Sequence, residues 1–226
     1  MFETRKLSLS TQFLVAAALV LCVSMAVLGT WVNHQITRSV LAASGAGGEA
    51  FMRSLIEPHL QDYDPGEPLA ADIEEALDDI FVGTPLARNI VSVKLWDSDG
   101  TVFYSSASKD IVGKRFVSTD VQSAAAGKIV AEFEDMISSE SAYEQGLNIP
   151  LIEVYAPLHK TDTNQVIAVG EIYEDARALA VQLQSSRTLT WIVVCLTTLL
   201  MLGVLYAIVR RGSYTIEEQR AELRRT

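Results

Sequence analysis

The chain has 226 residues, enough for one ordinary domain, and hydrophobic residues make up 49% of it. Its formal net charge is −10, and the segment 33–187 alone carries 24 acidic and 11 basic residues, giving −13. Such an acidic segment argues against binding to nucleic acid or to anionic lipid. Solubility explains the acidic excess, and a preference for a cationic ligand is the alternative. Both cysteines, Cys22 and Cys195, lie outside this segment, so it has no disulfide and no thiolate metal site.

Two uncharged apolar blocks predict membrane-spanning helices. A bilayer core about 30 Å thick needs roughly 20 apolar residues, and residues 9–32 and 188–209 each meet that length without a charged side chain. We therefore predict a cytoplasmic tail at 1–9 and transmembrane helices at 10–32 and 188–209.

The first apolar block has an alternative interpretation as a cleaved signal peptide. Arg5 and Lys6 would form its basic start, and residues 24–26, Ser-Met-Ala, resemble a cleavage site. The apolar run continues beyond that site through Trp31, and this length favours a retained anchor.

Basic residues beside the apolar blocks predict the orientation in the membrane. Arg5 and Lys6 precede the first block, and Arg210 and Arg211 follow the second. Cytoplasmic loops carry the excess of Lys and Arg. We therefore expect a multi-pass protein of the bacterial inner membrane, with both termini cytoplasmic and residues 33–187 extracytoplasmic.

The first half of the extracytoplasmic segment is expected to be helical. Residues 33–63 continue from the first apolar block with an apolar stripe at helical spacing. The run Ser-Gly-Ala-Gly-Gly at 44–48 interrupts this pattern, because glycine lowers helix stability, and it predicts a kink, a close helix–helix contact or a break. A turn at 64–68 and a short acidic helix at about 70–81 follow.

The second half is expected to form strands. An Asp-Ser-Asp-Gly turn at 97–100 separates the first two strands. The strands are predicted at 90–96, 101–105, 129–133, 149–158 and 166–173, with a mixed loop and short helix at 106–127. The predicted fold class is α+β, with a long N-terminal helix and a central antiparallel sheet of about five strands between two transmembrane helices.

The segment after the last strand predicts a continuous helix. Residues 174–187 have apolar residues at helical spacing, and neither Gly nor Pro separates them from the second apolar block. We expect one helix from about 175 to 209, which would carry a shift of the sheet across the membrane. Ala180 and Leu183 are the residues predicted to transmit this signal.

Several motifs stand in a recognisable order. They are the turn at 97–100, a strand ending in Tyr-Ser-Ser at 104–106, Ile-Val-Gly-Lys at 111–114, and a final hairpin over 153–172. This order resembles the Cache (PAS-like) extracytoplasmic sensor fold over about 33–187. Such domains are commonly the input of bacterial two-component sensor histidine kinases. The resemblance therefore implies a periplasmic small-molecule ligand, a homodimer, and a response regulator reached through a kinase region.

The tail at 210–226 looks like the juxtamembrane helix of such a kinase. Ile216 and Leu223 are seven residues apart, as in a coiled-coil seam, and we predict that they transmit the signal. A solvated charged helix is the alternative interpretation.

The chain itself contains no kinase domain. No histidine follows the second apolar block, because the three histidines are His34, His59 and His159. We expect either the input region of a kinase cut at Thr226, the sensor of a chemoreceptor or cyclic-dinucleotide enzyme, or a stand-alone membrane scaffold.

One face of the first strand predicts the ligand site. If Val91, Val93 and Leu95 pack on the long helix, alternation puts Lys94 and Trp96 on the other face. The resemblance implies a pocket on that face, closed by the loop between the second and third strands. The predicted ligand-binding residues are Lys94, Trp96, Tyr104, Arg115 and Tyr155. Aromatic walls with one or two cations would suit a small carboxylate or an amino acid, and ordinary core and surface roles are the alternative.

Other chemistry is not expected. The histidines are far apart and lack neighbours at metal-ligand spacing, so we predict no metal and no cofactor. The turn at 97–100 begins like a calcium loop, but Ser108 stands where the bidentate Glu would be. Ser105 and Ser106 lack the Gly-x-Ser-x-Gly elbow, so no catalytic residue is predicted.

Overall fold

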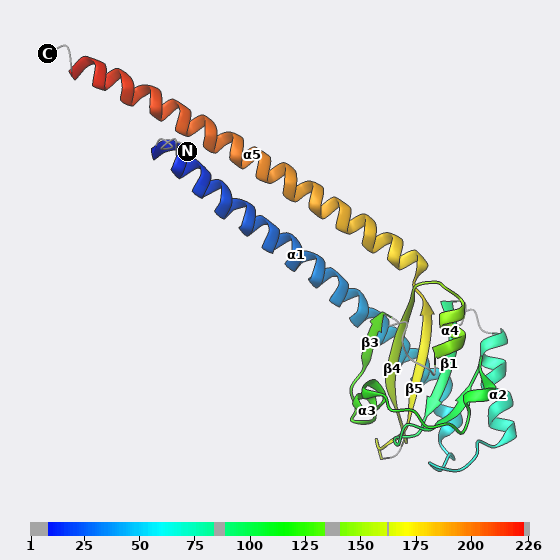
Figure 1. Ribbon diagram of the computed structural model, residues 1–226. Coiled ribbons are helices and arrows are strands. Elements are labelled where there is room, and N and C mark those ends of the chain that lie inside the picture. The colour runs from blue at the N-terminus through cyan, green and yellow to red at the C-terminus, as the bar shows by residue number, and fades with distance from the viewer. Residues whose placement is uncertain (1–8, 84–88, 134–140, 162, 224–226) are drawn as a thin grey trace, which may run out of the picture. The chain divides into compact units, whose positions relative to one another are not determined.

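The computed structural model describes residues 9–83, 89–133, 141–161 and 163–223 (Figure 1). The chain divides into two compact units. One unit combines residues 1–36 and 183–226, and the other spans residues 37–182. Helices α1 (Leu9–Phe51) and α5 (Arg177–Leu223) each contribute to both units.

The first unit consists of the apolar parts of α1 and α5. Within the described residues, two helical stretches, Gln12–Leu60 and Arg177–Arg211, are long and apolar enough to cross a membrane. Large apolar side chains on both helices are exposed, as expected for surfaces that face lipid. The helices touch at Gly29, where an added Cβ would lie 3.4 Å from the ring of Trp191. The prediction of one unbroken helix from about 175 to 209 is confirmed, and α5 continues to Leu223.

The second unit is built on a five-stranded antiparallel sheet with the order β2-β1-β5-β4-β3. Its strands are β1 (Ile90–Trp96), β2 (Val102–Ser105), β3 (Val130–Phe133), β4 (Leu151–His159) and β5 (Val166–Asp175). The predicted α+β class and all five predicted strands are therefore confirmed. The long strands β4 and β5 lie at the centre and are buried along almost their whole length.

Helical elements cover both faces of the sheet (Figure 1). On one face lie the end of α1, the π-helical turn η1 (Met52–Ile56), the short 3-10 helix η2 (Glu57–Leu60) and α2 (Ala71–Gly83). Their buried apolar side chains, among them Met52, Ile56 and Leu77, form the main core with the sheet. The other face carries α3 (Thr119–Ala125) and α4 (Ala142–Gly146), and η4 (Lys109–Ile111) follows β2.

The glycine run at 44–48 does not interrupt the helix, which corrects the expectation of a break there, and the close contact that it makes is with the sheet rather than with another helix. The run lies inside α1 and brings the helix close to the sheet. A Cβ on Gly48 would lie 2.8 Å from Ile172 Cδ1 and 2.9 Å from Val154 Cγ1. The loss of helix propensity is offset because only glycine allows α1 to approach β4 and β5 this closely.

Two neighbouring glycines test this explanation. Gly47 has no atom within 4 Å of an added Cβ, so Gly47→Ala is expected to stabilise the unit by about 0.5–1 kcal/mol through helix propensity. Gly48→Ala gains the same propensity but overlaps the sheet, which costs about 1–3 kcal/mol. We expect the free energy of unfolding of the Gly48 variant to be about 2 kcal/mol lower than that of the Gly47 variant. Native-state hydrogen exchange of the β5 amides measures this difference. Equal stabilisation by both changes would contradict the close approach.

Candidate functional site

The side chains of β1 alternate between two environments. Val93 and Leu95 belong to the core that packs against η1 and η2, as predicted, whereas Val91 is half-buried and does not join that core. Ser92, Lys94 and Trp96 point to the other face and are buried there. The alternation expected from the sequence is therefore confirmed for Lys94 and Trp96.

Lys94 lies at the centre of a buried polar group. Its Nζ donates to the Tyr173 hydroxyl at 3.0 Å and lies 4.2 Å from the centre of that ring. Glu144 Oε2 is 3.4 Å from Nζ, and Glu171 Oε1 is 3.8 Å from it. The side chains of all three charged residues have no exposed surface. These pairs lie in a medium where charges interact much more strongly than in water.

Glu171 gathers further donors from neighbouring strands. The Trp96 Nε1 group donates to Glu171 Oε2 at 2.7 Å, and the Tyr155 hydroxyl lies 2.9 Å from Glu171 Oε1. The same hydroxyl is 3.1 Å from Glu153 Oε2. Cross-strand pairing explains this assembly, because Glu171 on β5 stands opposite both Lys94 on β1 and Tyr155 on β4.

Helix α4 and the residue before it close this group of side chains. Glu144, on α4, accepts a hydrogen bond from the Ser92 hydroxyl at 2.5 Å, and the Ser141 hydroxyl lies 2.6 Å from the Tyr173 hydroxyl. Within the described residues, Glu144 Oε2 accepts no hydrogen bond. We call this set the polar cluster, and its members are Ser92, Lys94, Trp96, Ser141, Glu144, Glu153, Tyr155, Glu171 and Tyr173.

The polar cluster carries an excess of negative charge. One lysine stands against three glutamates, which gives a formal charge of −2 if all four side chains are ionised. Burial raises the pKa of Glu171, and the nearby Lys94 opposes that rise. Burial also raises the pKa of the Tyr155 and Tyr173 hydroxyls, so both remain proton donors.

Tyr104 lies on the opposite face from Lys94. It pairs with Leu95 across the strands, and paired residues share a face of the sheet. It therefore packs in the main core, where its hydroxyl donates to Asp78 on α2 at 2.7 Å. The register between β1 and β2, which shifts between Leu95 and Trp96, decides this placement.

Arg115 also lies away from the polar cluster. Its side chain is 67% exposed, and its Nε donates to the Asp99 carbonyl oxygen at 2.8 Å. The backbone of Arg115 forms a bridge with Thr101, which holds this residue beside the β1–β2 turn. Of the five predicted ligand residues, the structure brings Lys94, Trp96 and Tyr155 together and separates Tyr104 and Arg115 from them.

The predicted transmission residues lie along α5. Ala180 and Leu183 are half-buried on the helix that begins two residues after β5 ends. Ile216 and Leu223 fall within the same helix, in a part whose side chains lie outside the described residues.

Four acidic or aromatic members of the polar cluster were missed from the sequence. Glu153, Glu171 and Tyr173 lie within predicted strands, and the available signal was a glutamate inside an apolar strand, at Glu153 and at Glu171. Glu144 gave no such signal, because α4 was not predicted. Among the described residues, no group of three or more His, Cys, Asp or Glu side chains is arranged to hold a metal ion.

Comparisons with known proteins returned matches among solved structures only. No protein-family model matches the sequence, and no curated protein matches it. The solved structures that it resembles include sensor and ligand-binding domains of histidine kinases and chemoreceptors.

Three of these structures illustrate the likeness. The Escherichia coli DcuS sensor domain is 15% identical, with a TM-score of 0.40 over 69% of this chain and 97% of that domain. The sensor domain of the Vibrio cholerae histidine kinase DctB is 13% identical, with a TM-score of 0.40 over 69% of this chain and 58% of that one. The ligand-binding domain of the Pseudomonas aeruginosa amino acid chemoreceptor PctC, in complex with GABA, is 16% identical, with a TM-score of 0.38 over 67% and 62%.

Proposed function

We propose that this protein senses a small extracytoplasmic ligand at the polar cluster and transmits the signal through α5. The polar cluster is the observation that carries the proposal. Burying one lysine and three glutamates is costly for a domain that needs only stability, and buried ionisable groups in such an arrangement mark functional sites. The Cache resemblance of the sequence motifs agrees with this role.

The charge of the polar cluster favours a ligand with an ammonium group. Lys94 is already engaged by Glu144 and Glu171, so a ligand carboxylate would meet excess negative charge. An ammonium group would instead offset the buried carboxylates, and the aromatic rings of Tyr155 and Trp96 stand beside Glu171. The ligand class is therefore a small amine or a zwitterionic amino acid rather than a simple carboxylate.

The connection between β5 and α5 gives the route of the signal. Glu171 and Tyr173 lie on β5, which ends at Asp175, and α5 begins at Arg177. A ligand shifts the balance between two conformations only by its difference in affinity for them, so a fewfold difference provides under about 1.5 kcal/mol. On the basis of the flanking basic residues, we propose that residues 33–187 lie outside the inner membrane and that both termini are cytoplasmic. The homodimer is proposed from the Cache resemblance alone.

A ligand panel tests the binding site. Full-length protein in nanodiscs would be heated with the standard L-amino acids, aliphatic amines or aliphatic carboxylates, and the unfolding of the sheet followed. A ligand present at about 100 times its Kd stabilises by about 2.7 kcal/mol. We expect shifts with amines or amino acids only, reduced in Glu171→Gln and unchanged in the surface control Asp110→Asn. Shifts with carboxylates alone, or shifts that Glu171→Gln leaves unchanged, would contradict the site.

Substitutions on α5 test transmission. Ala180→Asp and Leu183→Asp are expected to abolish the ligand-dependent output while ligand affinity changes less than about twofold, because a half-buried charge disturbs the helix without touching the polar cluster. Val181→Asp on the exposed side of the same helix is the matched control. Output and affinity would be measured in the same cells and membranes. Unchanged output in the first two variants would contradict transmission through α5.

We further propose that the output is a two-component histidine kinase acting on a response regulator. The tail at 210–226, with Ile216 and Leu223 at heptad spacing, supports a coiled-coil connection to such a region. An N-terminal tag at the native locus gives the size of the natural polypeptide. A band at twice or more the 24.7 kDa of this sequence supports an attached output region, which phosphotransfer would then identify. A band near 24.7 kDa would point to a stand-alone membrane protein.

A further inference from the structure

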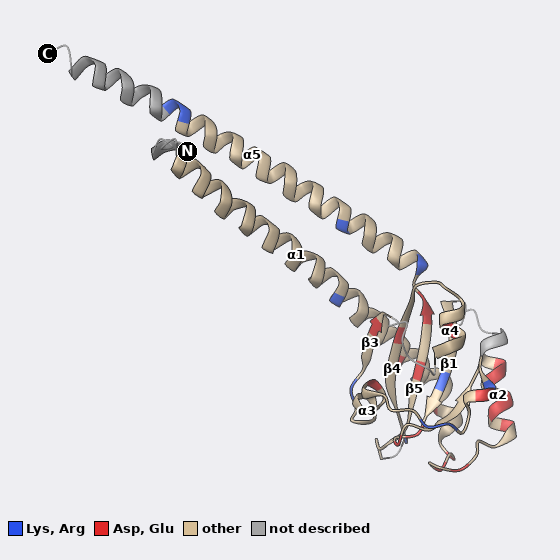
Figure 2. Cartoon of the chain, in the orientation of Figure 1, with Lys and Arg blue, Asp and Glu red and all other residues tan. Residues whose placement is uncertain are grey.

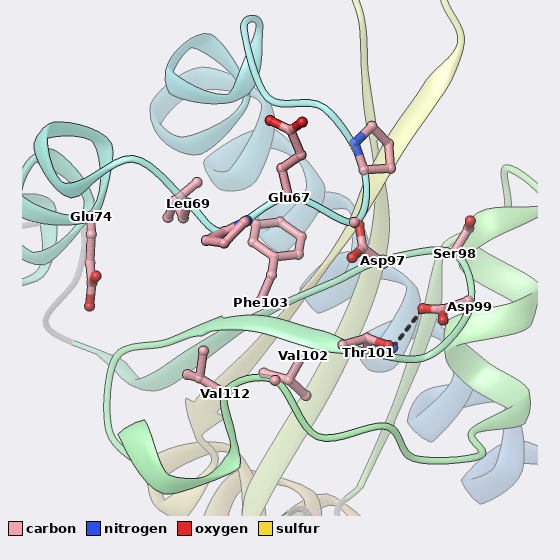
Figure 3. A pocket seen from close by; sticks show the side chains of 14 residues that line it. Glu67, Leu69, Glu74, Asp97, Ser98, Asp99, Thr101, Val102, Phe103 and Val112 are labelled. Atoms are coloured by element: carbon pink, nitrogen blue, oxygen red, sulfur yellow. Dashed lines mark hydrogen bonds between the residues drawn. The ribbon is translucent and has the colours of Figure 1, made fainter.

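A cavity lies at the far end of the sheet from α5, beside the β1–β2 turn. It is an open cavity of about 750 Å³, bounded by the turn at 65–69, the turn at 97–101, the start of β2 and residues 112–113 (Figure 3). This volume is within the range of small-molecule sites, which is about 300–1,000 Å³. Asp97, on its wall, directly follows the end of β1 and accepts a hydrogen bond from the Tyr63 hydroxyl.

The wall of this cavity is aromatic and apolar in part. Phe103, Leu69, Val102 and Val112 line it, and Figure 3 shows the Phe103 ring between the 65–69 turn and β2. The Phe103 ring stacks on Tyr63 with 4.3 Å between the ring centres, which fixes its orientation. A rigid aromatic side chain gives an apolar ligand a preformed contact surface.

The charged groups on the wall are all acidic. Glu67, Glu74, Asp97 and Asp99 line the cavity, and its lining contains no Lys, Arg or His within the described chain. Figure 2 shows the acidic character of the neighbouring α2. Lys109 contacts Glu74 at 2.7 Å and Arg115 contacts Asp99 at 3.8 Å, and among the described residues no cation pairs with Glu67 or Asp97.

Asp97 is held in place by its surroundings. It is only 7% exposed, and the Tyr63 hydroxyl donates to its Oδ1 at 2.9 Å. Tyr63 therefore links the two chemical parts of the cavity, because it fixes both the carboxylate of Asp97 and the ring of Phe103. A carboxylate and an aromatic ring fixed on one wall are the groups that recognise organic ammonium ions.

We propose that this cavity is a second binding site, which takes an organic ammonium ion with an apolar body. The ammonium group lies among Glu67, Asp97 and Asp99, and the apolar body packs on Phe103 and Leu69. An acidic wall disfavours anions and leaves a neutral molecule of the same shape with the apolar contact alone. The site is separate from the polar cluster, because its lining includes none of the residues of that cluster.

Calorimetric titration of the full chain in phosphatidylcholine nanodiscs tests the proposal, with empty nanodiscs as the blank. The probes are phenethylammonium and its neutral counterpart phenethyl alcohol. We expect the ammonium to bind at least about fivefold more tightly than the alcohol, with a Kd that rises with salt. Glu67→Gln is expected to weaken ammonium binding about two- to fivefold and leave the alcohol unchanged. Phe103→Leu is expected to weaken binding of the ammonium more than binding of the alcohol, because the face of the aromatic ring is lost.

Two control variants locate the probe. Asp110→Asn removes an exposed carboxylate from nearby η4 without touching the cavity, and it is expected to leave the Kd unchanged. Glu171→Gln is the background for all of these titrations, because it removes binding at the polar cluster and changes no residue of the cavity lining. Equal affinity for the two probes, absence of binding, or ammonium binding that Glu67→Gln and Phe103→Leu leave unchanged would overturn the proposal.

Discussion

Replacing Lys94 with methionine is expected to lower the free energy of unfolding of the sheet unit by about 3–5 kcal/mol near neutral pH. The methionine fills much of the same volume but leaves Glu144 and Glu171 buried without their cation. Removing one partner of a buried ion pair has a cost of this size, because the remaining charge is desolvated and uncompensated. Native-state hydrogen exchange of the β5 amides would measure the change. Lys160→Met, at an exposed lysine, is the control and is expected to change stability by less than about 0.5 kcal/mol.

The same variant should show a characteristic pH dependence. Burial already raises the pKa of Glu171, and loss of Lys94 removes an influence that opposes the rise. An acid whose folded-state pKa is raised favours folding below its unfolded pKa, and this contribution is lost as pH rises through the folded value. The free energy of unfolding that Lys94→Met loses relative to the unsubstituted protein is therefore expected to be smaller at about pH 4.5 than at about pH 8. A deficit that grows on acidification would contradict this account of the cluster.

The second large effect is expected at the β1–β2 turn. Gly100 has a φ of +89°, and an added Cβ there would collide with the backbone carbonyl oxygen of Phe116. Gly66 has the same φ, but its added Cβ would meet nothing within 4 Å. Both substitutions to alanine place an L side chain in the left-handed region, which costs about 1–2 kcal/mol. Gly100→Ala also forces the backbone apart, for a total of about 3 kcal/mol or more.

The pair of variants separates the collision from the backbone preference. Gly66→Ala is expected to lower the free energy of unfolding by about 1 kcal/mol. The further loss of about 2 kcal/mol in Gly100→Ala measures the overlap with the Phe116 carbonyl oxygen. Hydrogen exchange of the β1 and β2 amides in the full chain is a suitable measurement. Equal losses in the two variants would show that the segment at 116 moves aside freely.

The sequence was sufficient for the elements that local pattern determines. Alternation in 90–96 predicted the two faces of β1, and the absence of Gly and Pro between 174 and 188 predicted an unbroken α5. The structure of the glycine run at 44–48 was harder to predict. Helix propensity favours an interruption there, but packing against the sheet keeps the helix continuous. Gly48 serves a contact with Ile172 and Val154 that lies more than a hundred residues away along the chain.

The candidate site was predictable only in part, because strand register is not a local property. Lys94, Trp96 and Tyr155 share a face, whereas the pairing of Tyr104 with Leu95 places Tyr104 in the helix-side core. The carboxylates that define the chemistry come from β4, β5 and α4. Glu153 and Glu171 could have been suspected as charges within apolar strands, but Glu144 depends on how a short helix folds back onto β1.

The most direct test of ligand sensing at the polar cluster is the number of protons released when an amine binds. The titration would use the amine or amino acid that stabilises the protein most, in two buffers with different ionisation enthalpies. An ammonium group beside Glu171 lowers the pKa of that buried carboxyl, so binding is predicted to release protons, and Glu171→Gln is predicted to abolish the release. An apparent binding enthalpy that is the same in both buffers, or proton release that persists in Glu171→Gln, would contradict binding at the polar cluster.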